Sequence, residues 1–311
     1  MPLQLQENAT FPVFEEYILK IVSYETPTTD KIRLLFDQFD KDQDGFLDTA
    51  EAEEFNNNVI EKINSLKSAL IIVDFQNDFV HEEGTLRLKD GPAQEDPLEI
   101  VDNLNALLQR HSDFDLTIFT IDWHPKNHIS FYENANEDDR IRSNPAEPVR
   151  PFSLVQFEKP KLDQVVYPAH AIQGSFGAEI HEKILKPEDA IIVEKGYDVY
   201  VDSYSGFGDN RGVSKTQLGP ILRQHNIEAL FLCGIASDIC LAYTAIDASK
   251  LGFYTVVVED CIKGIDPVEI QKKKDEIIAL GVPYVNSEVV FEFLTQRKVP
   301  WEWLQRLAEG N

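Results

Sequence analysis

The sequence has 311 residues, which favours two domains or one large α/β domain with an appendage. An apolar share of 43% is ample for a hydrophobic core and argues against a disordered chain. The net charge of −25 disfavours nucleic acid and anionic membranes as partners, because both bind positively charged surfaces.

The N-terminal stretch MPLQLQENATFPVFEEY contains neither a basic region nor an apolar core, so we expect no secretory signal. No run of residues approaches the roughly 18 apolar residues that a membrane helix needs. The three cysteines form no C-x-x-C pair, as is typical of a reduced intracellular chain. We therefore expect a cytoplasmic protein, with the nucleus as an alternative location.

Residues 1–66 are predicted to form a small helical module. An apolar stripe at Phe11, Phe14, Ile18 and Ile21 has helical spacing. Thr28 or Thr29 is suited to cap a second helix, which would bury Ile32, Leu35, Phe36 and Phe39. A third helix is expected over residues 49–65.

Between the second and third helices, residues 40–51 read DKDQDGFLDTAE and resemble the calcium loop of an EF-hand. The expected ligands are Asp40, Asp42, Asp44, the carbonyl of Phe46, Asp48 and a bidentate Glu51, with Gly45 at the sharp turn. The alternative is an acidic solvated loop. Only one such loop is present although EF-hands usually pair, so the sequence leaves both a structural and a regulatory calcium site open.

From residue 67 to residue 311, short apolar runs alternate with helical stretches. Runs begin near residues 69, 116, 190, 229 and 254, and helices are expected near 97–110, 178–185, 216–225, 237–251 and 268–280. This alternation predicts an α/β domain in which helices cover both faces of a mostly parallel sheet. Residues 134–164 are rich in proline and charge, and we expect a long loop or an excursion of the chain near the functional site.

Polar side chains follow four of the apolar runs. Asp74 follows the first run, Asp122 and His124 the second, Lys195 the third, and the segment GIASDIC, which ends in Cys240, the fourth. Ligands of open α/β sheets bind beyond the carboxyl ends of the strands, so we expect these side chains to meet there.

Cys240 has the setting of a nucleophile. It falls in the first turn of a helix that Ser237 or Asp238 is expected to cap, where the helix dipole and a nearby lysine lower a thiol pKa. A neighbouring carboxylate would exchange the thiol proton, and backbone N–H groups would stabilise an oxyanion. Cys233 and Cys261 are expected to be ordinary core residues.

Asp122 and His124 form a D-x-H pair that is suited to bind a metal ion. A third ligand commonly comes from elsewhere in the chain, and the candidates are His128 and His170. Histidine nitrogens with one carboxylate suit zinc or iron with open coordination positions.

Five segments resemble the nicotinamidase branch of the isochorismatase-like cysteine hydrolases. They are IIVDFQNDF (71–79), DWHPKNHISF (122–131), YPAHAIQGSFG (167–177), EKGYDVYVDSYSGFG (194–208) and CGIASDICLAYTA (233–245), and their order and spacing also agree. The resemblance implies the isochorismatase-like, Rossmann-like three-layer fold. It also implies hydrolysis of nicotinamide to nicotinate and ammonia through a cysteine thioester, which feeds NAD salvage.

The resemblance assigns roles to individual residues. Cys240 corresponds to the nucleophile, Asp74 to the general base and acid, and Lys195 to the third member of the triad. Asp122, His124 and His170 correspond to the metal ligands, with zinc as the expected metal and iron or manganese as alternatives. The backbone N–H groups of Ala236 and Cys240 would form the oxyanion hole beside a cis peptide at Ile235–Ala236. Phe79, Tyr167 and Tyr204 would line the ring pocket, where Tyr167 replaces the tryptophan of many relatives.

Two other functions remain open from the sequence. A related amidase that acts on another small amide or carbamoyl compound would keep the triad and change the substrate. A calcium-responsive binding protein with an inactive hydrolase domain is the alternative from a different class, and the intact Asp74, Lys195 and Cys240 argue against it. The expected partner is the small substrate nicotinamide, and a homo-oligomer remains open.

Overall fold

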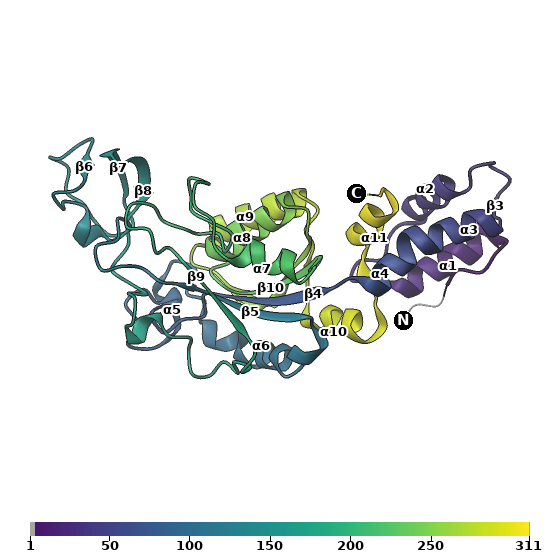
Figure 1. Cartoon of the computed structure of the whole chain (residues 1–311), viewed down its shortest axis with the longest axis horizontal. Coiled ribbons are helices and arrows are strands. Elements are labelled where there is room, and N and C mark those ends of the chain that lie inside the picture. The colour runs from purple at the N-terminus through teal and green to yellow at the C-terminus, as the bar shows by residue number, and fades with distance from the viewer. Residues whose placement is uncertain (1–3, 311) are drawn as a thin grey trace.

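The structure is a computed structural model that describes residues 4–310, so residues 1–3 of the expected helical module and residue 311 of the expected hydrolase domain lie outside it. An α/β body occupies the middle of the molecule (Figure 1). The N-terminal helical segment, residues 4–66, lies at one end, and a small antiparallel sheet projects from the other.

The N-terminal helical segment is built around aromatic side chains that the apolar stripes bring together. Phe14 lies edge-on to Phe36 and to Phe55, with ring centroids 5.5 and 5.1 Å apart. Thr28 caps the second helix by accepting a hydrogen bond from the N–H of Lys31. The helices are α1 (Phe11–Ile21), α2 (Thr29–Phe39), α3 (Thr49–Phe55) and α4 (Glu61–Ser65), with a π-helical turn at Asn56–Ile60.

The central sheet has six strands, all parallel, in the order β12-β11-β10-β4-β5-β9. The strands are β4 (Ser68–Val73), β5 (Leu116–Asp122), β9 (Ile191–Lys195), β10 (Ala229–Ile235), β11 (Tyr254–Lys263) and β12 (Tyr284–Val285). Every residue of β4 and β10 is buried. Parallel strands covered on both faces read as continuous apolar runs, and this explains the sequence pattern.

Alternate side chains of β4 enter two separate cores. Leu70 and Ile72 face α6 and α10, whereas Ile71 and Val73 face α7 and α8. The helices therefore lie on both sides of the sheet (Figure 1), as the sequence predicts. They are α5 (Asn77–Val80), α6 (Val101–Leu108), α7 (Leu218–Gln224), α8 (Cys240–Lys250), α9 (Pro267–Ala279), α10 (Ser287–Gln296) and α11 (Trp301–Ala308). None of the helices between residues 4 and 310 combines the length and the apolar character needed to cross a membrane.

Two segments differ from the expectation. Residues 179–185 form no helix, because only a short 3₁₀ turn at Phe176–Ala178 precedes an irregular stretch. The expected loop over residues 134–164 is a three-stranded antiparallel sheet of β6 (Ile141–Arg142), β7 (Leu154–Lys159) and β8 (Lys161–Val165). We call residues 134–165 the excursion. Its prolines and charges hide the strand pattern because one face of this small sheet is exposed to solvent.

The C-terminal segment joins the helical segment to the sheet. Strand β13 (Val299–Pro300) pairs in parallel with β2 (Val22–Ser23) of the N-terminal helical segment. The next helix, α11, buries Trp303 against Phe231 and Phe293 of the α/β body, with ring centroids 5.7 and 6.0 Å apart. The Gln38 side chain of α2 donates a hydrogen bond to the carbonyl of Ala308.

Truncation of Trp303 should strongly destabilise the protein. Its ring is 2% exposed, and replacement by alanine leaves a large cavity, which typically costs about 3–5 kcal/mol of unfolding free energy. Urea unfolding of W303A measures the loss. The control is L34A, because Leu34 is 72% exposed and its truncation should change stability by less than about 0.5 kcal/mol. Equal stability of W303A and L34A would contradict this packing.

Candidate active site

The carboxyl ends of three adjacent strands bring the expected polar residues together. β4, β5 and β9 are neighbours in the sheet, and Asp74 directly follows β4. Asp122 is the last residue of β5 and pairs in register with Lys195, the last residue of β9. The polar ends of the strands therefore converge at one edge of the sheet, as the sequence predicts.

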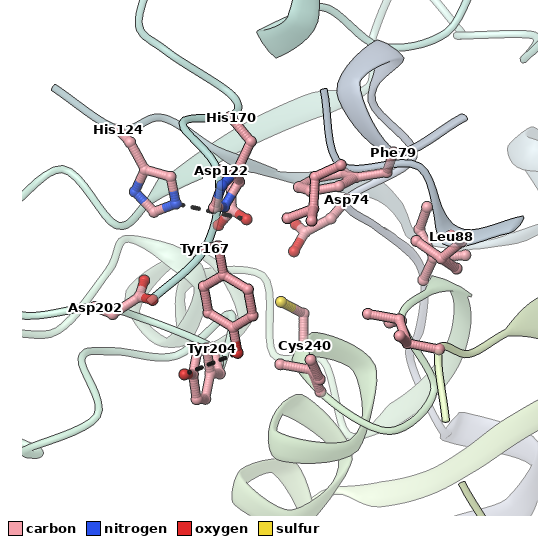
Figure 2. Close-up of a pocket in the computed structure, with 15 residues that line it drawn as sticks. Asp74, Phe79, Leu88, Asp122, His124, Tyr167, His170, Asp202, Tyr204 and Cys240 are labelled. Atoms are coloured by element: carbon pink, nitrogen blue, oxygen red, sulfur yellow. Dashed lines mark hydrogen bonds and ion pairs between the residues drawn. The ribbon is translucent and has the colours of Figure 1, made fainter. Parts of the chain in front are cut away.

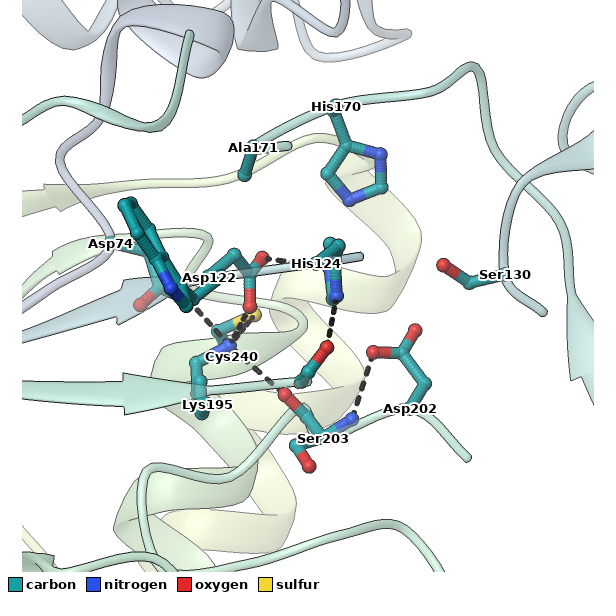
Figure 3. A network of polar contacts seen from close by, with 12 residues as sticks. Asp74, Asp122, His124, Ser130, His170, Ala171, Lys195, Asp202, Ser203 and Cys240 are labelled. Atoms are coloured by element: carbon teal, nitrogen blue, oxygen red, sulfur yellow. Dashed lines mark hydrogen bonds and ion pairs between the residues drawn. The ribbon is translucent and has the colours of Figure 1, made fainter. Parts of the chain in front are cut away.

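Lys195 lies at the centre of this group (Figure 3). Its Nζ lies 2.8 Å from Asp74 Oδ2 and 2.5 Å from Asp122 Oδ1. The same ammonium donates hydrogen bonds to the carbonyl of Ser203 at 2.9 Å and to Cys240 Sγ at 3.4 Å. Lys195 is completely buried, and its two carboxylate partners keep its pKa well above the usual value despite that burial.

Asp74 is placed to exchange a proton near neutral pH. Burial raises the pKa of Asp74 to about 6, because removal from water disfavours the charged carboxylate more than Lys195 favours it. Oδ1 accepts a hydrogen bond from the hydroxyl of Thr120. Oδ2 forms the ion pair with Lys195 but accepts no well-directed hydrogen bond from the described residues. This oxygen is thus available to take a proton.

Cys240 is the first residue of α8 and follows a tight turn after β10. The peptide bond Ile235–Ala236 is cis, as the family resemblance implies. Gly234 has φ +107°, and a Cβ at this position would lie 2.2 Å from the carbonyl oxygen of Val73, so only glycine fits. Neither the backbone N–H of Ala236 nor that of Cys240 donates a hydrogen bond to another of residues 4–310. Both N–H groups remain available at the turn.

The electrostatics of Cys240 differ from the expectation in two respects. The residue before α8 is Ile239, and neither Ser237 nor Asp238 caps this helix. The Asp238 carboxylate instead accepts hydrogen bonds from the N–H groups of Ile265 and Asp266. Burial raises the pKa of the Cys240 thiol well above its usual value, although Lys195 opposes the shift. The resting residue is therefore a thiol that needs a base, and not a preformed thiolate.

Asp122, His124 and His170 present ligand atoms within 4.8 Å of one another. Both histidines place Nδ1 2.7 Å from a backbone carbonyl, that of Gly196 for His124 and that of Pro168 for His170. A carbonyl only accepts hydrogen bonds, so each Nδ1 carries the proton and each Nε2 has a free lone pair. Burial lowers the pKa of His124, which keeps it neutral, and His124 Nε2 lies 3.7 Å from Asp122 Oδ2. One carboxylate and two imidazole nitrogens fit a divalent transition metal.

His128, the other candidate for a third ligand, has a different environment. Its ring stacks on that of His124 with centroids 4.2 Å apart. Its Nδ1 lies 2.6 Å from the hydroxyl of Ser130, and Nε2 faces the carbonyl of Val201 at 3.4 Å. Both ring nitrogens have hydrogen-bond partners, and burial lowers the pKa of His128 to about 3. This arrangement favours His170 over His128 as the third ligand.

A cavity of about 500 Å³ connects these groups (Figure 2). The Cys240 sulfur, Asp74, Asp122, His124 and His170 line it on the polar side. The three aromatic residues expected at a ring pocket, Phe79, Tyr167 and Tyr204, line it as well. The Phe79 ring lies 5.6 Å from that of His170, and the hydroxyls of Tyr167 and Tyr204 lie 3.4 Å apart. A planar ring of the size of pyridine fits the chemistry of this lining.

Two residues near the cavity were not predicted from the sequence. Gln76 holds the strand ends together, since its side chain pairs with the N–H and the carbonyl of Asp122 at 2.8 Å each. Asp202 lines the cavity from the loop after β9. Both belong to segments that resemble the family, IIVDFQNDF and VDSYSGFG, but neither ends an apolar run. Strand-end reasoning alone therefore does not select them.

The acidic loop between α2 and α3 forms a separate group. Asp40, Asp42 and Glu51 present oxygens within 4.8 Å of one another, whereas Asp44 and Asp48 do not join this set. Gly45 has φ +89°, as the sharp turn requires. The Asp48 side chain accepts a hydrogen bond from the N–H of Glu51 and caps α3.

EF-hand loops usually pair with each other through a short strand. In this chain the strand of the acidic loop pairs instead with a strand near the N-terminus. The short strand β3 (Phe46–Leu47) within the loop pairs in the antiparallel direction with β1 (Ala9–Thr10), just before α1. The N-terminal stretch thus occupies the edge of β3.

Alkylation should select Cys240 and follow the ionisation of Asp74. Cys233 and Cys261 are fully buried, whereas Cys240 opens on the cavity. Asp74 accepts the thiol proton only as a carboxylate, so the alkylation rate should rise as pH increases through about 6. Peptide mass spectrometry after iodoacetamide treatment measures this rate, and D74N should lower it at least tenfold. A pH profile that is the same in D74N and the wild type would exclude Asp74 as the base.

Comparison with known proteins places this arrangement in a family. The family model described as "Isochorismatase domain" matches residues 68–288. The nicotinamidase of Acinetobacter baylyi is 35% identical over 220 residues, which cover 70% of this chain and 92% of that protein. The yeast nicotinamidase bound to the inhibitor nicotinaldehyde is similar in structure, with a TM-score of 0.60, 28% identity and coverage of 70% of this chain and 99% of the yeast chain.

A further solved structure, the pyrazinamidase of Pyrococcus horikoshii in complex with zinc, has a TM-score of 0.55 and 29% identity. It covers 71% of this chain and 99% of its own chain. The family match begins at β4, the first strand of the parallel sheet along the chain, and includes every strand end described above. This chain belongs to the isochorismatase family.

Proposed function

We propose that this chain hydrolyses nicotinamide to nicotinate and ammonia and so feeds NAD salvage. The observation that carries the proposal is the shared cavity, in which a thiol, a buried carboxylate and a potential metal site face one another across aromatic side chains. Nicotinamidases that are 28–35% identical to this chain support the same activity.

Asp122, His124 and His170 would hold a divalent metal, and zinc is the expected ion because the similar Pyrococcus pyrazinamidase binds it. Iron and manganese are alternatives for the same donor set. When bound, the ion supplies a Lewis acid that holds the pyridine nitrogen and so orients the carboxamide toward Cys240. Phe79, Tyr167 and Tyr204 would hold the ring between their side chains.

The first half of the reaction transfers the acyl group to the protein. Asp74 takes the proton of the Cys240 thiol, and the sulfur attacks the carboxamide carbon. The carbonyl oxygen becomes an oxyanion, which the backbone N–H groups of Ala236 and Cys240 stabilise. Asp74 then gives its proton to the amide nitrogen, the C–N bond breaks, and ammonia leaves. A thioester on Cys240 remains.

The second half releases nicotinate. Asp74 takes a proton from a water molecule, and the resulting hydroxide adds to the thioester carbon. The C–S bond breaks, and the proton on Asp74 returns to the sulfur. Throughout the reaction, Lys195 keeps a positive charge 2.8 Å from Asp74 and 3.4 Å from the sulfur, so it stabilises whichever of the two is ionised.

Replacement of the nucleophile should abolish turnover. C240A removes the sulfur that forms the thioester, so ammonia release from nicotinamide should fall at least a thousandfold. Circular dichroism and metal content should match the wild type, because Cys240 is not among the proposed ligands. Ammonia release by C240A at a rate near that of the wild type would refute the mechanism.

The same assay separates the alternative functions. A family amidase that acts on another small amide would not need a metal to hold a pyridine nitrogen, so its activity would survive removal of the metal by a chelator. Loss of nicotinamide hydrolysis on chelation, with recovery when zinc is added back, supports the proposal. A binding protein with an inactive hydrolase domain would release no ammonia under any of these conditions.

We further propose that residues 1–66 form an EF-hand-like calcium module appended to a hydrolase domain of residues 67–311. The ligands would be Asp40, Asp42, Asp44, the Phe46 carbonyl, Asp48 and Glu51. The convergence of Asp40, Asp42 and Glu51 and the positive φ of Gly45 support the proposal. Asp44 and Asp48 would have to turn toward the ion on binding.

The position of the loop favours a structural role for calcium. Helix α4 leads into the amino end of β4, whereas Asp74 and the cavity lie at the carboxyl end of that strand. In Figure 1 the acidic loop at β3 lies at the outer end of the N-terminal helical segment, on the side away from the strand ends. We therefore expect calcium to stabilise the fold without changing the rate of hydrolysis.

Calcium should raise the thermal midpoint of unfolding in the wild type. A ligand that binds only the native state adds about 2.7 kcal/mol at a hundredfold excess over its Kd. E51Q should lose this response, because Glu51 is the expected bidentate ligand. E53Q removes an exposed carboxylate of the same helix and should respond as the wild type does. Scanning fluorimetry with and without calcium measures the shift, and an equal shift in E51Q would rule out the loop as the site.

A further inference from the structure

Asp202 is a buried carboxylate that the proposed reaction does not use. It lies in the loop after β9, is 3% exposed and lines the cavity beside the tyrosines of the ring pocket (Figure 2). Oδ1 accepts a hydrogen bond from the backbone N–H of Ser203 at 2.8 Å. Oδ2 accepts one from Gln164 Nε2 at 3.3 Å. Both donors are neutral.

No positive side chain accompanies Asp202. Among residues 4–310, no lysine or arginine lies within 4.0 Å of its oxygens. A buried carboxylate without a counter-ion is costly, because two neutral hydrogen bonds replace only part of its hydration. The negative charge of the Asp202 carboxylate therefore needs a positive partner other than a lysine or arginine side chain.

The position of Asp202 indicates that the balancing positive charge is a metal ion on the neighbouring ligands. One ligand atom from each of Asp202, His124 and His128 falls within a group less than 4.8 Å across. His124 is also a member of the group with Asp122 and His170. Asp202 is thus adjacent to the proposed metal ligands but is not among them.

The formal charges around the cavity also indicate a divalent cation. Asp74, Asp122 and Asp202 contribute three carboxylates, and Lys195 is their one ammonium partner within the described chain, which leaves a charge of −2. Lys195 is already shared between Asp74 and Asp122. A divalent cation would neutralise the remainder, whereas a monovalent ion would not.

The excursion holds Asp202 in this position. Gln164 belongs to β8, is 3% exposed and donates a hydrogen bond to the carboxylate. Its other amide hydrogen is directed to the carbonyl of Val165 at 2.7 Å, which fixes the orientation of the amide group. A segment that projects from the α/β body thereby contacts, through one buried side chain, a residue that lines the cavity.

From these observations we infer that Asp202 is a positioning residue for the metal. It supplies the second negative charge that a divalent cation on Asp122, His124 and His170 requires, without being a ligand itself, and Gln164 from the excursion aims it. This inference rests on the metal site proposed above. Mutation of the groups that surround metal ligands typically costs 10–100-fold in metal affinity.

The test is the zinc affinity of D202N, measured by competition with a chromogenic chelator. Asparagine has almost the same shape and still accepts the hydrogen bond from Ser203, but it carries no charge. Zinc should bind D202N 10–100-fold more weakly than the wild type. D260N is the matched control, because Asp260 also accepts hydrogen bonds from a backbone N–H and a side chain but does not line the cavity. Its zinc affinity should stay within twofold of the wild type.

A second readout separates positioning from a purely structural role. In the presence of chelator, D202N should unfold close to the wild-type temperature, because removal of a buried unbalanced charge offsets the loss of the hydrogen bond from Gln164, which the asparagine Nδ2 cannot accept. Its stabilisation by added zinc should be smaller. A lower midpoint of the metal-free form together with unchanged zinc affinity would overturn the inference. Should D202N not fold, D202S provides the same test, because a serine hydroxyl accepts the Ser203 N–H without a charge.

The H170A variant distinguishes this inference from the metal site on which it rests. If neither the wild type nor H170A binds zinc, the proposed metal site itself is wrong. If H170A loses zinc while D202N binds it within twofold of the wild type, the metal site stands and only the role of Asp202 fails.

Discussion

The buried ammonium of Lys195 is the interaction on which the site depends. Two carboxylates that end neighbouring strands lie within 2.8 Å of it, and without it both would be buried charges with no positive partner. One side of the ammonium faces Asp74 and Cys240, the proposed proton-transfer pair, and the other faces Asp122, a proposed metal ligand. Because Asp122 contributes to the raised pKa of Asp74, a cation on Asp122 would lower that pKa. We therefore expect occupancy of the proposed metal site to favour the ionised form of Asp74.

Much of this arrangement follows from the sequence because parallel strands impose a simple rule. Each strand buried on both faces reads as an apolar run, and the residue after it lies at the same edge of the sheet as its counterparts. Asp74, Asp122 and Lys195 could thus be placed together before the structure was known. The register that pairs Asp122 with Lys195 could not be predicted, since it depends on how β5 and β9 align. The excursion was missed because its strands are short and half exposed.

The ionisation state of Cys240 shows where local rules fail. A helix start and a nearby lysine both favour a thiolate, and both are present. Removal of the sulfur from bulk water and the two nearby carboxylates outweigh them, and this balance depends on the depth of the site, which the sequence does not reveal. Gln76 and Asp202 were missed for a related reason. Each makes a hydrogen bond with a residue at least 38 positions away, and the local sequence pattern does not indicate such a contact.

The parallel pairing of β2 with β13 has a consequence for biosynthesis. The hydrogen bond from Gln38 to Ala308 spans 270 residues, and Val22 pairs with Val299 across a similar distance. Contacts this distant in sequence form late, because a long loop must close first. On the ribosome the N-terminal helices emerge first but must wait for α11, the last helix, before their surface is covered. Until then the nascent chain exposes the apolar side chains that pack against α11 in the finished fold.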